Sequence, residues 1–305
     1  MKIRFIWFWQ SFDENDNFFT QLLQASGVEV EIVRNKDEYC DLEIVSVYGP
    51  VKRKIHEKIH SLRKRLPVGF ADTTVSYPLE YEPDSKNFER RVWYTSENVR
   101  PPYLGRFDGF LSYDQDDYFG KNVYLPLWYM HAGFFKRGRD PRSGASPRID
   151  ELTKPRDLNN VKEKFACAFV GNAQPTRMHA IQALKKFSQV DLFGPAFGNK
   201  VTDKMSISHE YKYMLCFEND LFPGYVTEKL IDAYLCGTIP IYWGDLGFDL
   251  DIERESFYNL TSTKKMSVAL NNLLSIEDKE YKGLYEKPFL KSIPNLDGIR
   301  KQLLG

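Results

Sequence analysis

Residues 211–245 have the sequence YKYMLCFENDLFPGYVTEKLIDAYLCGTIPIYWGD. The apolar run 213–217 predicts a buried strand, and a polar loop with Pro and Gly follows it. We predict a helix over 227–236 and a second strand over 239–243. A strand, a helix and a strand in this order form a βαβ unit, so we expect a parallel sheet with helices packed on it.

The junction between the first strand and the helix is suited to an anion. The free N–H groups of a first helical turn, together with the positive end of the helix dipole, point at the carboxyl edge of a parallel sheet. Thr227 is placed to cap this helix, and Lys229 adds a positive charge to the same turn. We therefore predict a phosphate site here. Taken alone, the pattern is equally typical of a capped helix with surface charges.

Apolar runs alternate with helix-compatible stretches on both sides of this segment, which indicates parallel α/β sheets. Between Lys136 and Asn160 the composition turns to Arg, Pro, Gly and Ser, which marks a domain boundary. We predict an N-terminal α/β domain over 1–150, a C-terminal one over 151–290 and a short, polar closing segment over 291–305. Further strands are expected at 3–8, 28–33, 42–47, 67–71, 91–94, 109–113, 122–125, 165–170 and 190–193, and further helices at 177–187, 267–274 and 276–285.

Composition narrows the class of protein. The 42 basic and 42 acidic side chains cancel, so we expect no nucleic-acid partner, and any anion must be held locally. The four cysteines are widely spaced and include no CxxC pair, which predicts reduced, buried thiols. No apolar stretch approaches the roughly 18 residues of a membrane span, and the first residues lack a cleavable leader pattern. We therefore expect a soluble, cytoplasmic protein without a transmembrane segment.

Residues 217–244 resemble the signature of the α-1,3/α-1,4-fucosyltransferase family. That family shows a strand ending in FEN, a loop, YVTEK, and then a small-residue helix that leads to a G-x-x-P-[IV]-x-x-G strand. Here these elements are Phe217–Asn219, Tyr225–Lys229 and Gly237–Gly244. The resemblance implies a GT-B architecture, in which two Rossmann-like α/β domains face each other across a cleft and the C-terminal domain binds GDP-fucose.

Two more segments resemble the same family. The first half carries Tyr94-Thr95-Ser96-Glu97-Asn98, followed by FDGF at 107–110 and LPLWY at 125–129, in an order similar to the family's YTxEN, FDxxxxxD and LPLY. The family's general base is the carboxylate after that strand, so the resemblance implies that Glu97 is catalytic. A weaker match, FVGN at 169–172 with Arg177 opening a helix, implies that Arg177 contacts the donor phosphates.

Fucosyl transfer sets the chemistry that these residues must perform. The acceptor oxygen attacks as the β-linked GDP leaves from the opposite face, through a transition state with oxocarbenium character. A carboxylate must take the acceptor proton, and cations must meet the departing diphosphate. We expect no metal ion and no cofactor other than the donor GDP-fucose, and an oligosaccharide acceptor fucosylated at O3 of GlcNAc or Glc in lactose-type sugars. The expected roles are base for Glu97, diphosphate contacts for Arg177 and Lys229, sugar hydroxyl contacts for Asn219 and Glu228, with Glu228 also catalytic, and a phosphate or sugar contact for Tyr225.

Other motifs point to other classes. His56–His60 is a literal HExxH, the spacing of a zinc protease, but the surrounding VKRKIHEKIHSLRKR carries seven Lys or Arg residues in fifteen, which favours a solvated amphipathic helix. Asp114-Gln115-Asp116 resembles a DxD metal site, although the phosphate-binding helix and its lysine make a metal unnecessary. The basic run 52–65 leaves a peripheral contact with lipids or acidic glycans open. A GT-B enzyme with another donor or acceptor, and a non-enzymatic sugar binder with no need of Glu97, also stay open.

Overall fold

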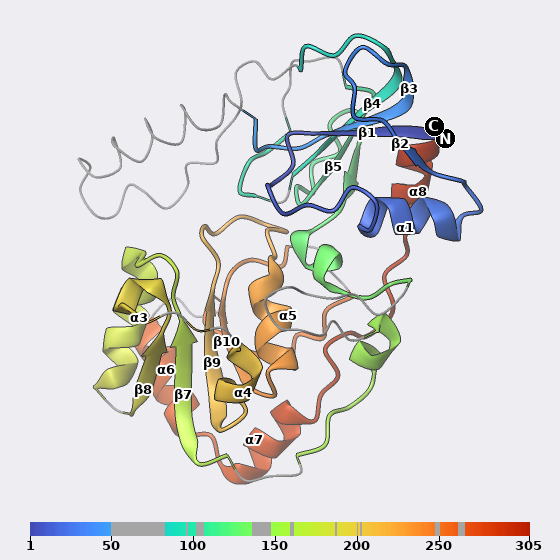
Figure 1. The fold of residues 1–305 in the computed structure, drawn as a ribbon. Helices are drawn as coiled ribbons and strands as arrows, with labels where there is room; N and C mark the ends of the chain where they lie inside the picture. Colours follow the sequence, from blue (N-terminus) through green and yellow to red (C-terminus); the bar gives the residue numbers. More distant parts are fainter. Residues whose placement is uncertain are drawn as a thin grey trace.

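Two separate sheets form the framework of the computed structural model (Figure 1). One has six strands in the order β2-β1-β3-β4-β5-β6, and the other has five in the order β11-β10-β9-β7-β8. Neighbouring strands are parallel in both. The expected α/β fold, with one parallel sheet in each half of the chain, is therefore confirmed. The structure describes residues 1–49, 83–95, 97–101, 107–135, 148–158, 162–186, 188–199, 201, 203–247, 251–261 and 266–305.

The N-terminal sheet contains six of the seven strands expected there, and the seventh, at 67–71, lies outside the described residues. The HExxH at His56–His60 lies outside them too. The helix α1 begins after the capping residue Asn17, whose side chain accepts from the N–H groups of Phe19 and Thr20. The elements are β1 (Lys2–Ile6), α1 (Phe18–Ala25), β2 (Glu31–Ile32), β3 (Cys40–Val45), β4 (Phe88–Tyr94), β5 (Gly109–Ser112), β6 (Asn122–Tyr124) and the 3-10 helix η1 (Leu127–His131).

A charged row crosses the middle of this sheet. Glu43 of β3 is fully buried and lies in register with Arg4 of β1 and Arg91 of β4. Its Oε2 is 3.0 Å from Arg4 Nη1 and its Oε1 is 2.6 Å from Arg91 Nε. A one-residue slip of any of these strands would leave a buried charge without its partner, so this row favours the observed register.

The C-terminal sheet contains the four expected strands in the expected order along the chain, with ends that shift by at most a few residues, whereas the short strand at 258–259 and the helix at 204–208 were not expected. The helix expected at 177–187 begins earlier, because Pro175 takes its first position, where a missing N–H costs nothing. The elements are the 3-10 helix η2 (Ile149–Thr153), β7 (Lys164–Phe169), α3 (Pro175–Lys185), β8 (Val190–Phe193), the 3-10 helix η3 (Pro195–Phe197), α4 (Lys204–Ser208), β9 (Tyr211–Phe217), α5 (Glu228–Leu235), β10 (Ile239–Trp243), β11 (Tyr258–Asn259), α6 (Met266–Leu274) and α7 (Asp278–Tyr285).

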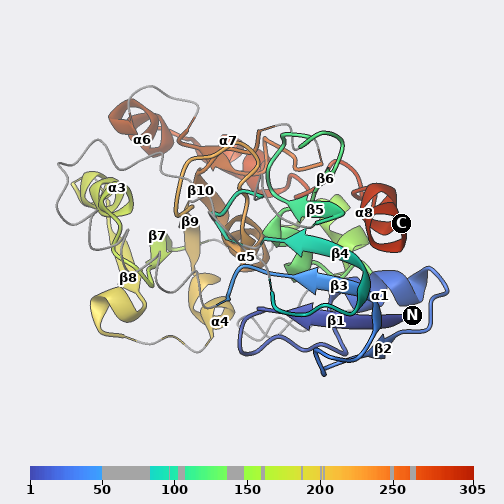
Figure 2. The same ribbon diagram turned by 90° about the horizontal axis from the view of Figure 1, so that it is seen from above.

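The last segment of the chain is a helix, α8 (Asp297–Leu304), although its polar composition predicted only a short closing segment. It returns to the N-terminal domain and packs on β5 and β6 (Figure 2). Ile299 and Leu303 are buried there, and Gln302 Nε2 donates to the carbonyl of Lys121 at 3.0 Å. Arg90 Nε donates to the carbonyl of Gln302 at 3.0 Å, so the side chain and the backbone of Gln302 are both hydrogen-bonded to the N-terminal domain.

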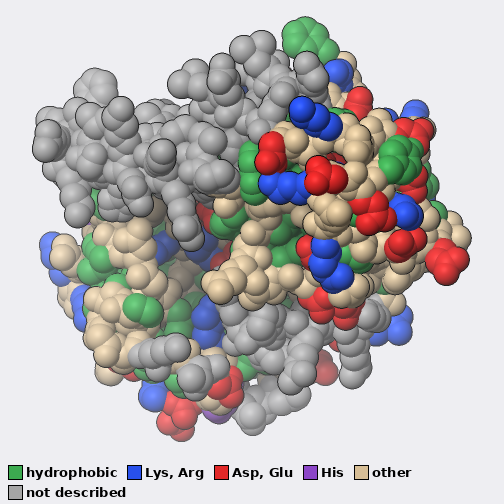
Figure 3. Space-filling model, turned by 45° about the horizontal axis from the view of Figure 1, so that its top comes forward, with side chains coloured by type: hydrophobic (Ala, Val, Ile, Leu, Met, Phe, Trp, Pro, Cys, Tyr) green, Lys and Arg blue, Asp and Glu red, His purple; other side chains and the backbone are tan. Residues whose placement is uncertain are grey.

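The two sheets are arranged so that their carboxyl edges converge. In the view from above, β3 and β4 run toward the side on which β9 and β10 lie (Figure 2). Acidic and basic side chains are interspersed on the described face of the N-terminal domain in Figure 3, in keeping with the zero net charge of the chain. All four cysteines are buried and free, as predicted. No helix within the described ranges is long and apolar enough to cross a membrane.

Candidate active site

The topology of the second sheet places one point where a ligand is expected. The chain proceeds from β7 to β8 on one side and from β9 to β10 and β11 on the other, so the direction of winding reverses between β7 and β9. Ligands of open parallel sheets bind outside the carboxyl ends of the strands at such a point. The segments that leave β7 and β9 there lead to α3, which carries Arg177, and to α5, which carries Lys229.

Glu218, directly after β9, is fully buried and organises this point. Its Oε1 accepts from the N–H of Thr227 at 2.9 Å and from the hydroxyl of Tyr242 at 3.3 Å. Its Oε2 accepts from the hydroxyl of Thr227 at 2.7 Å and from Lys229 Nζ at 3.1 Å. With both oxygens satisfied, the carboxylate fixes the start of α5 against the end of β9. We did not assign a role to Glu218 from the sequence, although an acidic residue directly after a buried strand was the available signal.

Lys229 lies on the first turn of α5 and is partly exposed, with 26% of its side chain accessible. Its Nζ contacts Glu218 and donates to the hydroxyl oxygen of Thr227 at 3.0 Å, while Thr227 caps the helix, as predicted. Burial alone would lower the pKa of the Lys229 ammonium, but the charges of Glu218 and Glu228 offset this and raise the pKa above its ordinary value of 10.5. A stable cation is therefore present at this helix N-terminus.

Arg177 lies on α3 and is almost fully buried. Its Nη1 donates to the carbonyl of Asn172 and its Nη2 to the carbonyl of Phe217, each at 2.7 Å. Burial lowers the pKa of this guanidinium, and the charge of Glu218 opposes that change. Arg177 thus ties the loop after β7 to the end of β9, and its charge acts on that of Lys229.

The other donor-side residues lie on the same loop and helix turn but differ in exposure. Asn219 is exposed, and its carbonyl accepts from Gln174 Nε2 at 3.0 Å. Glu228 is half-buried as the first residue of α5. Tyr225 is buried, with 2% exposure, and its ring lies edge-on to Tyr113 of the N-terminal domain, with 5.0 Å between the ring centroids.

Glu97 approaches this loop from the other domain. It follows β4, is half-buried, and its Oε1 accepts from the Tyr48 hydroxyl at 2.7 Å. Burial raises the pKa of Tyr225 well above 10.0, and the charges of Glu218, Glu97 and Glu228 raise it further. The residue after Glu97, Asn98, donates from Nδ2 to Asp220 Oδ2 at 2.6 Å, which brings the segment that carries Glu97 to the loop between β9 and α5. No pattern in the sequence singled out Tyr48.

The DxD at Asp114-Gln115-Asp116 is an ion-paired loop. Arg100 Nε contacts Asp114, Arg100 Nη2 lies 3.2 Å from Asp116, and the hydroxyl of Tyr118 donates to Asp114 at 2.8 Å. Within the part of the chain that the structure describes, no group of three or more His, Cys, Asp or Glu side chains is placed to hold a metal ion.

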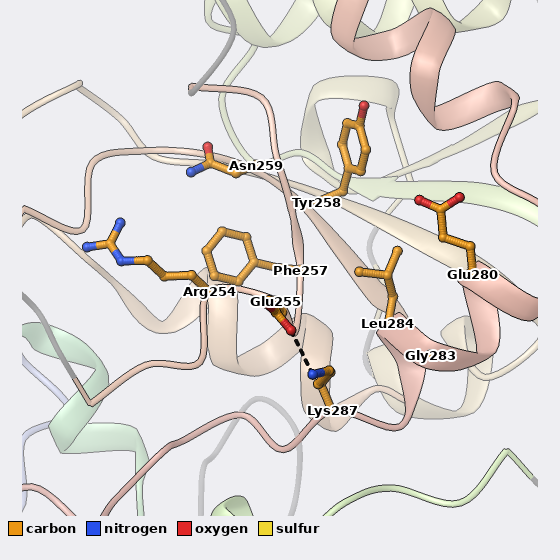
Figure 4. Close-up of a pocket in the computed structure, with 9 residues that line it drawn as sticks. All are labelled: Arg254, Glu255, Phe257, Tyr258, Asn259, Glu280, Gly283, Leu284 and Lys287. Atoms are coloured by element: carbon orange, nitrogen blue, oxygen red, sulfur yellow. Dashed lines mark ion pairs between the residues drawn. The ribbon is translucent and has the colours of Figure 1, made fainter.

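A surface hollow of about 520 Å³ lies elsewhere on the C-terminal domain, between β11 and α7 (Figure 4). The ion pair of Glu255 and Lys287 spans its rim, with 2.6 Å between the charged atoms. None of the predicted site residues lines it. Its walls are formed by Arg254, Glu255, Phe257, Tyr258, Asn259, Glu280, Gly283, Leu284 and Lys287.

Two α/β domains, each built on its own parallel sheet, make up a two-domain glycosyltransferase fold of the GT-B type. Comparison with solved structures agrees over the whole chain. A crystal structure of an α1,3-fucosyltransferase has a TM-score of 0.68 and 22% sequence identity, covering 100% of this chain and 90% of that one. A structure of an α1,3-fucosyltransferase with GDP-fucose has a TM-score of 0.66 and 20% identity, with the same coverage.

The amino-acid sequence also matches a known protein family over part of its length. Residues 159–287 match the C-terminal domain of glycosyltransferase family 10 (fucosyltransferase). The α-(1,3)-fucosyltransferase FucT of Helicobacter pylori is 30% identical over 261 residues, which are 76% of this chain and 54% of that protein. The 4-galactosyl-N-acetylglucosaminide 3-alpha-L-fucosyltransferase 9 of Bos taurus is 39% identical over 87 residues, 27% of this chain and 24% of that protein. Residues 159–287 therefore carry the C-terminal domain of this fucosyltransferase family, and the chain spans about half the length of the H. pylori relative.

Proposed function

We propose that this protein transfers L-fucose from GDP-fucose to a hydroxyl group of an oligosaccharide, with inversion at the anomeric carbon. The observation that carries the proposal is the position of Glu97 on the N-terminal domain, where its neighbour Asn98 is hydrogen-bonded to Asp220 on the loop that leads to Lys229. The N-terminal domain, 1–150, would hold the acceptor, and the C-terminal domain, 151–290, the donor.

The donor diphosphate would bind at the reversal point between β7 and β9. Lys229 supplies a formal charge there, and the N-terminus of α5 supplies the positive end of the helix dipole. The Lys229 ammonium has three hydrogens, so it can keep Glu218 and Thr227 while meeting a phosphate oxygen. Arg177, with two nitrogens on backbone carbonyls, holds the two loops in place and adds positive charge beside the diphosphate. Asn219 and Glu228 are exposed enough to contact sugar hydroxyls.

In the transfer step the acceptor oxygen forms a bond to the anomeric carbon of fucose while the bond from that carbon to the GDP oxygen breaks. The acceptor proton passes to the carboxylate of Glu97, which Tyr48 orients through its hydroxyl. The electron pair of the broken bond leaves with GDP, whose developing charge Lys229 and Arg177 stabilise. Tyr225, which is buried, shapes the wall between the two partners.

We propose a lactose- or N-acetyllactosamine-type acceptor, fucosylated at O3 of Glc or GlcNAc. The names of the bacterial and bovine relatives, both 3-fucosyltransferases, support this choice. We also propose that no metal ion takes part, because Arg100 neutralises the carboxylates of Asp114 and Asp116. The buried, free cysteines support a reducing, cytoplasmic location.

The test is release of GDP from GDP-fucose in the presence of lactose, N-acetyllactosamine or no acceptor, each with and without EDTA. We expect release that depends on the acceptor and survives EDTA, and an α-linked fucose in the product by NMR. GDP-mannose in place of GDP-fucose is the donor control and should give no transfer. Equal release without acceptor would argue for a hydrolase, and an absolute need for Mn²⁺ would return Asp114 and Asp116 to the site.

A further inference from the structure

A hydrogen bond joins the two domains directly beside Glu97, the proposed base. Asn98 Nδ2, from the N-terminal domain, donates to Asp220 Oδ2 of the C-terminal domain at 2.6 Å. The hydroxyl of Tyr113 donates to Asn98 Oδ1 at 3.1 Å. A carboxylate only accepts hydrogen bonds, so the amide nitrogen of Asn98 must face Asp220, and the orientation of the amide is fixed by its partners.

The contact is shielded from water. Asp220 is 5% exposed and Tyr113 is 2% exposed. The ring of Tyr113 also packs edge-on against Phe222, with 5.7 Å between centroids, and against Tyr225. A hydrogen bond to an ionised carboxylate is stronger than a neutral one, and low water access strengthens it further. Asn98 is therefore held on both sides by groups that are themselves fixed.

The two bonded residues each stand next to a residue of the proposed site. Asn98 follows Glu97, and Asp220 follows Asn219 on the loop between β9 and α5. We infer that the Asn98–Asp220 hydrogen bond positions the base against the bound donor, so that both are positioning residues for transfer. This inference rests on the proposed function. Since misplacing a reacting group by about 1 Å can cost on the order of 100-fold in rate, such a bond should affect kcat more than donor binding.

Exchange of the two side chains gives a sharp test. Asn98→Asp places two carboxylates side by side, with no donor between them. Asp220→Asn replaces the charged acceptor with a second amide, so that two neutral amides face each other. The double variant, with Asp at 98 and Asn at 220, restores one donor, one acceptor and the original net charge. Tyr113 can still donate to either residue at 98. We expect Asn98→Asp to lower kcat about 10- to 100-fold with the GDP dissociation constant changed by less than about threefold, and the double variant to recover most of the loss.

Tyr124→Phe is the matched control. It removes another bond between the domains, from the Tyr124 hydroxyl to the carbonyl of Gly224 at 3.1 Å, while it keeps the aromatic ring. We expect near wild-type kcat, because this contact does not adjoin Glu97. Calorimetry with GDP, turnover and melting temperature are measured for all variants.

If the wild type transfers fucose and Asn98→Asp has the same kcat, the positioning role is overturned and the proposed function stays intact. A parallel loss of kcat and GDP affinity without recovery in the double variant would overturn it as well. A wild-type protein that transfers no fucose to any acceptor would instead count against the proposed function.

Discussion

The hydroxyl of Tyr48 donates to Glu97 Oε1 at 2.7 Å and joins the segments that follow two neighbouring strands, β3 and β4. Tyr48→Phe removes this bond and keeps the ring, which packs edge-on to Trp9 with 6.0 Å between centroids. We expect turnover to fall about tenfold because the carboxylate loses an orienting partner, with GDP affinity unchanged. Single-turnover rates beside calorimetry with GDP check this, and a weakened GDP affinity would contradict it.

Glu97→Gln tests the base itself. Glutamine has the size of glutamate but no basic oxygen, so transfer should fall about 10²- to 10⁴-fold while GDP-fucose still binds to the other domain. Turnover, GDP-fucose affinity and melting temperature are measured on one preparation. Turnover within about threefold of the wild type would remove Glu97 from the mechanism.

Lys229→Ala should weaken GDP binding and lower turnover together, since a charge on the diphosphate acts in both the ground and the transition state. Lys204→Ala is a matched control. Lys204 pairs with the buried Asp232 at 3.3 Å, and 28% of its side chain is exposed, close to the 26% of Lys229. Both variants remove the lysine that pairs with a buried carboxylate, so both should lose stability, but only Lys229→Ala should lose GDP affinity. Equal GDP affinity in the two variants would reject the donor-site assignment.

The pKa of Lys229 predicts a pH response. Because the folded pKa lies above the ordinary 10.5, the stability contributed by its charge is fully present below pH 10.5 and is lost only as pH rises through the folded value. The difference in unfolding free energy between wild type and Lys229→Ala should therefore be constant between about pH 7 and 9. Urea unfolding at several pH values measures it. A difference that shrinks across this range would mean that Lys229 loses its proton near neutrality.

The buried thiols should be inert in the folded protein. Burial raises the pKa of Cys40 and of Cys236 to about 11, so on the order of 0.1% of each is thiolate at pH 8. We expect a disulfide reagent such as DTNB to modify them only at the rate of unfolding. Fast modification of native protein at pH 8 would show that one of these sites opens.

The local part of the site could be predicted from sequence because it is built from neighbours. The strand that ends at Phe217, the cap at Thr227 and the charge at Lys229 all lie on one strand-loop-helix unit, so polarity and spacing determine their arrangement. The succession of strands and helices along the chain followed from the same alternation of patterns.

The long-range contacts had no local signal. Tyr48 and Glu97 are 49 residues apart, and Asn98 and Asp220 are 122 apart, so nothing in either segment indicates its partner. The burial of Tyr225 likewise depends on Tyr113, which belongs to the other domain. Such pairs are set by the way two domains meet, and periodicity within one element carries no information about that.

The first domain is completed only when α8 has been made, because this helix follows both sheets in the chain. Its residues are translated after both sheets, yet it covers β5 and β6, which are made much earlier. Until its residues are made, the surface that receives Ile299 and Leu303 lacks α8 as its cover. A chain truncated before Asp297 would thus keep every strand of the second sheet beside a first sheet that lacks α8.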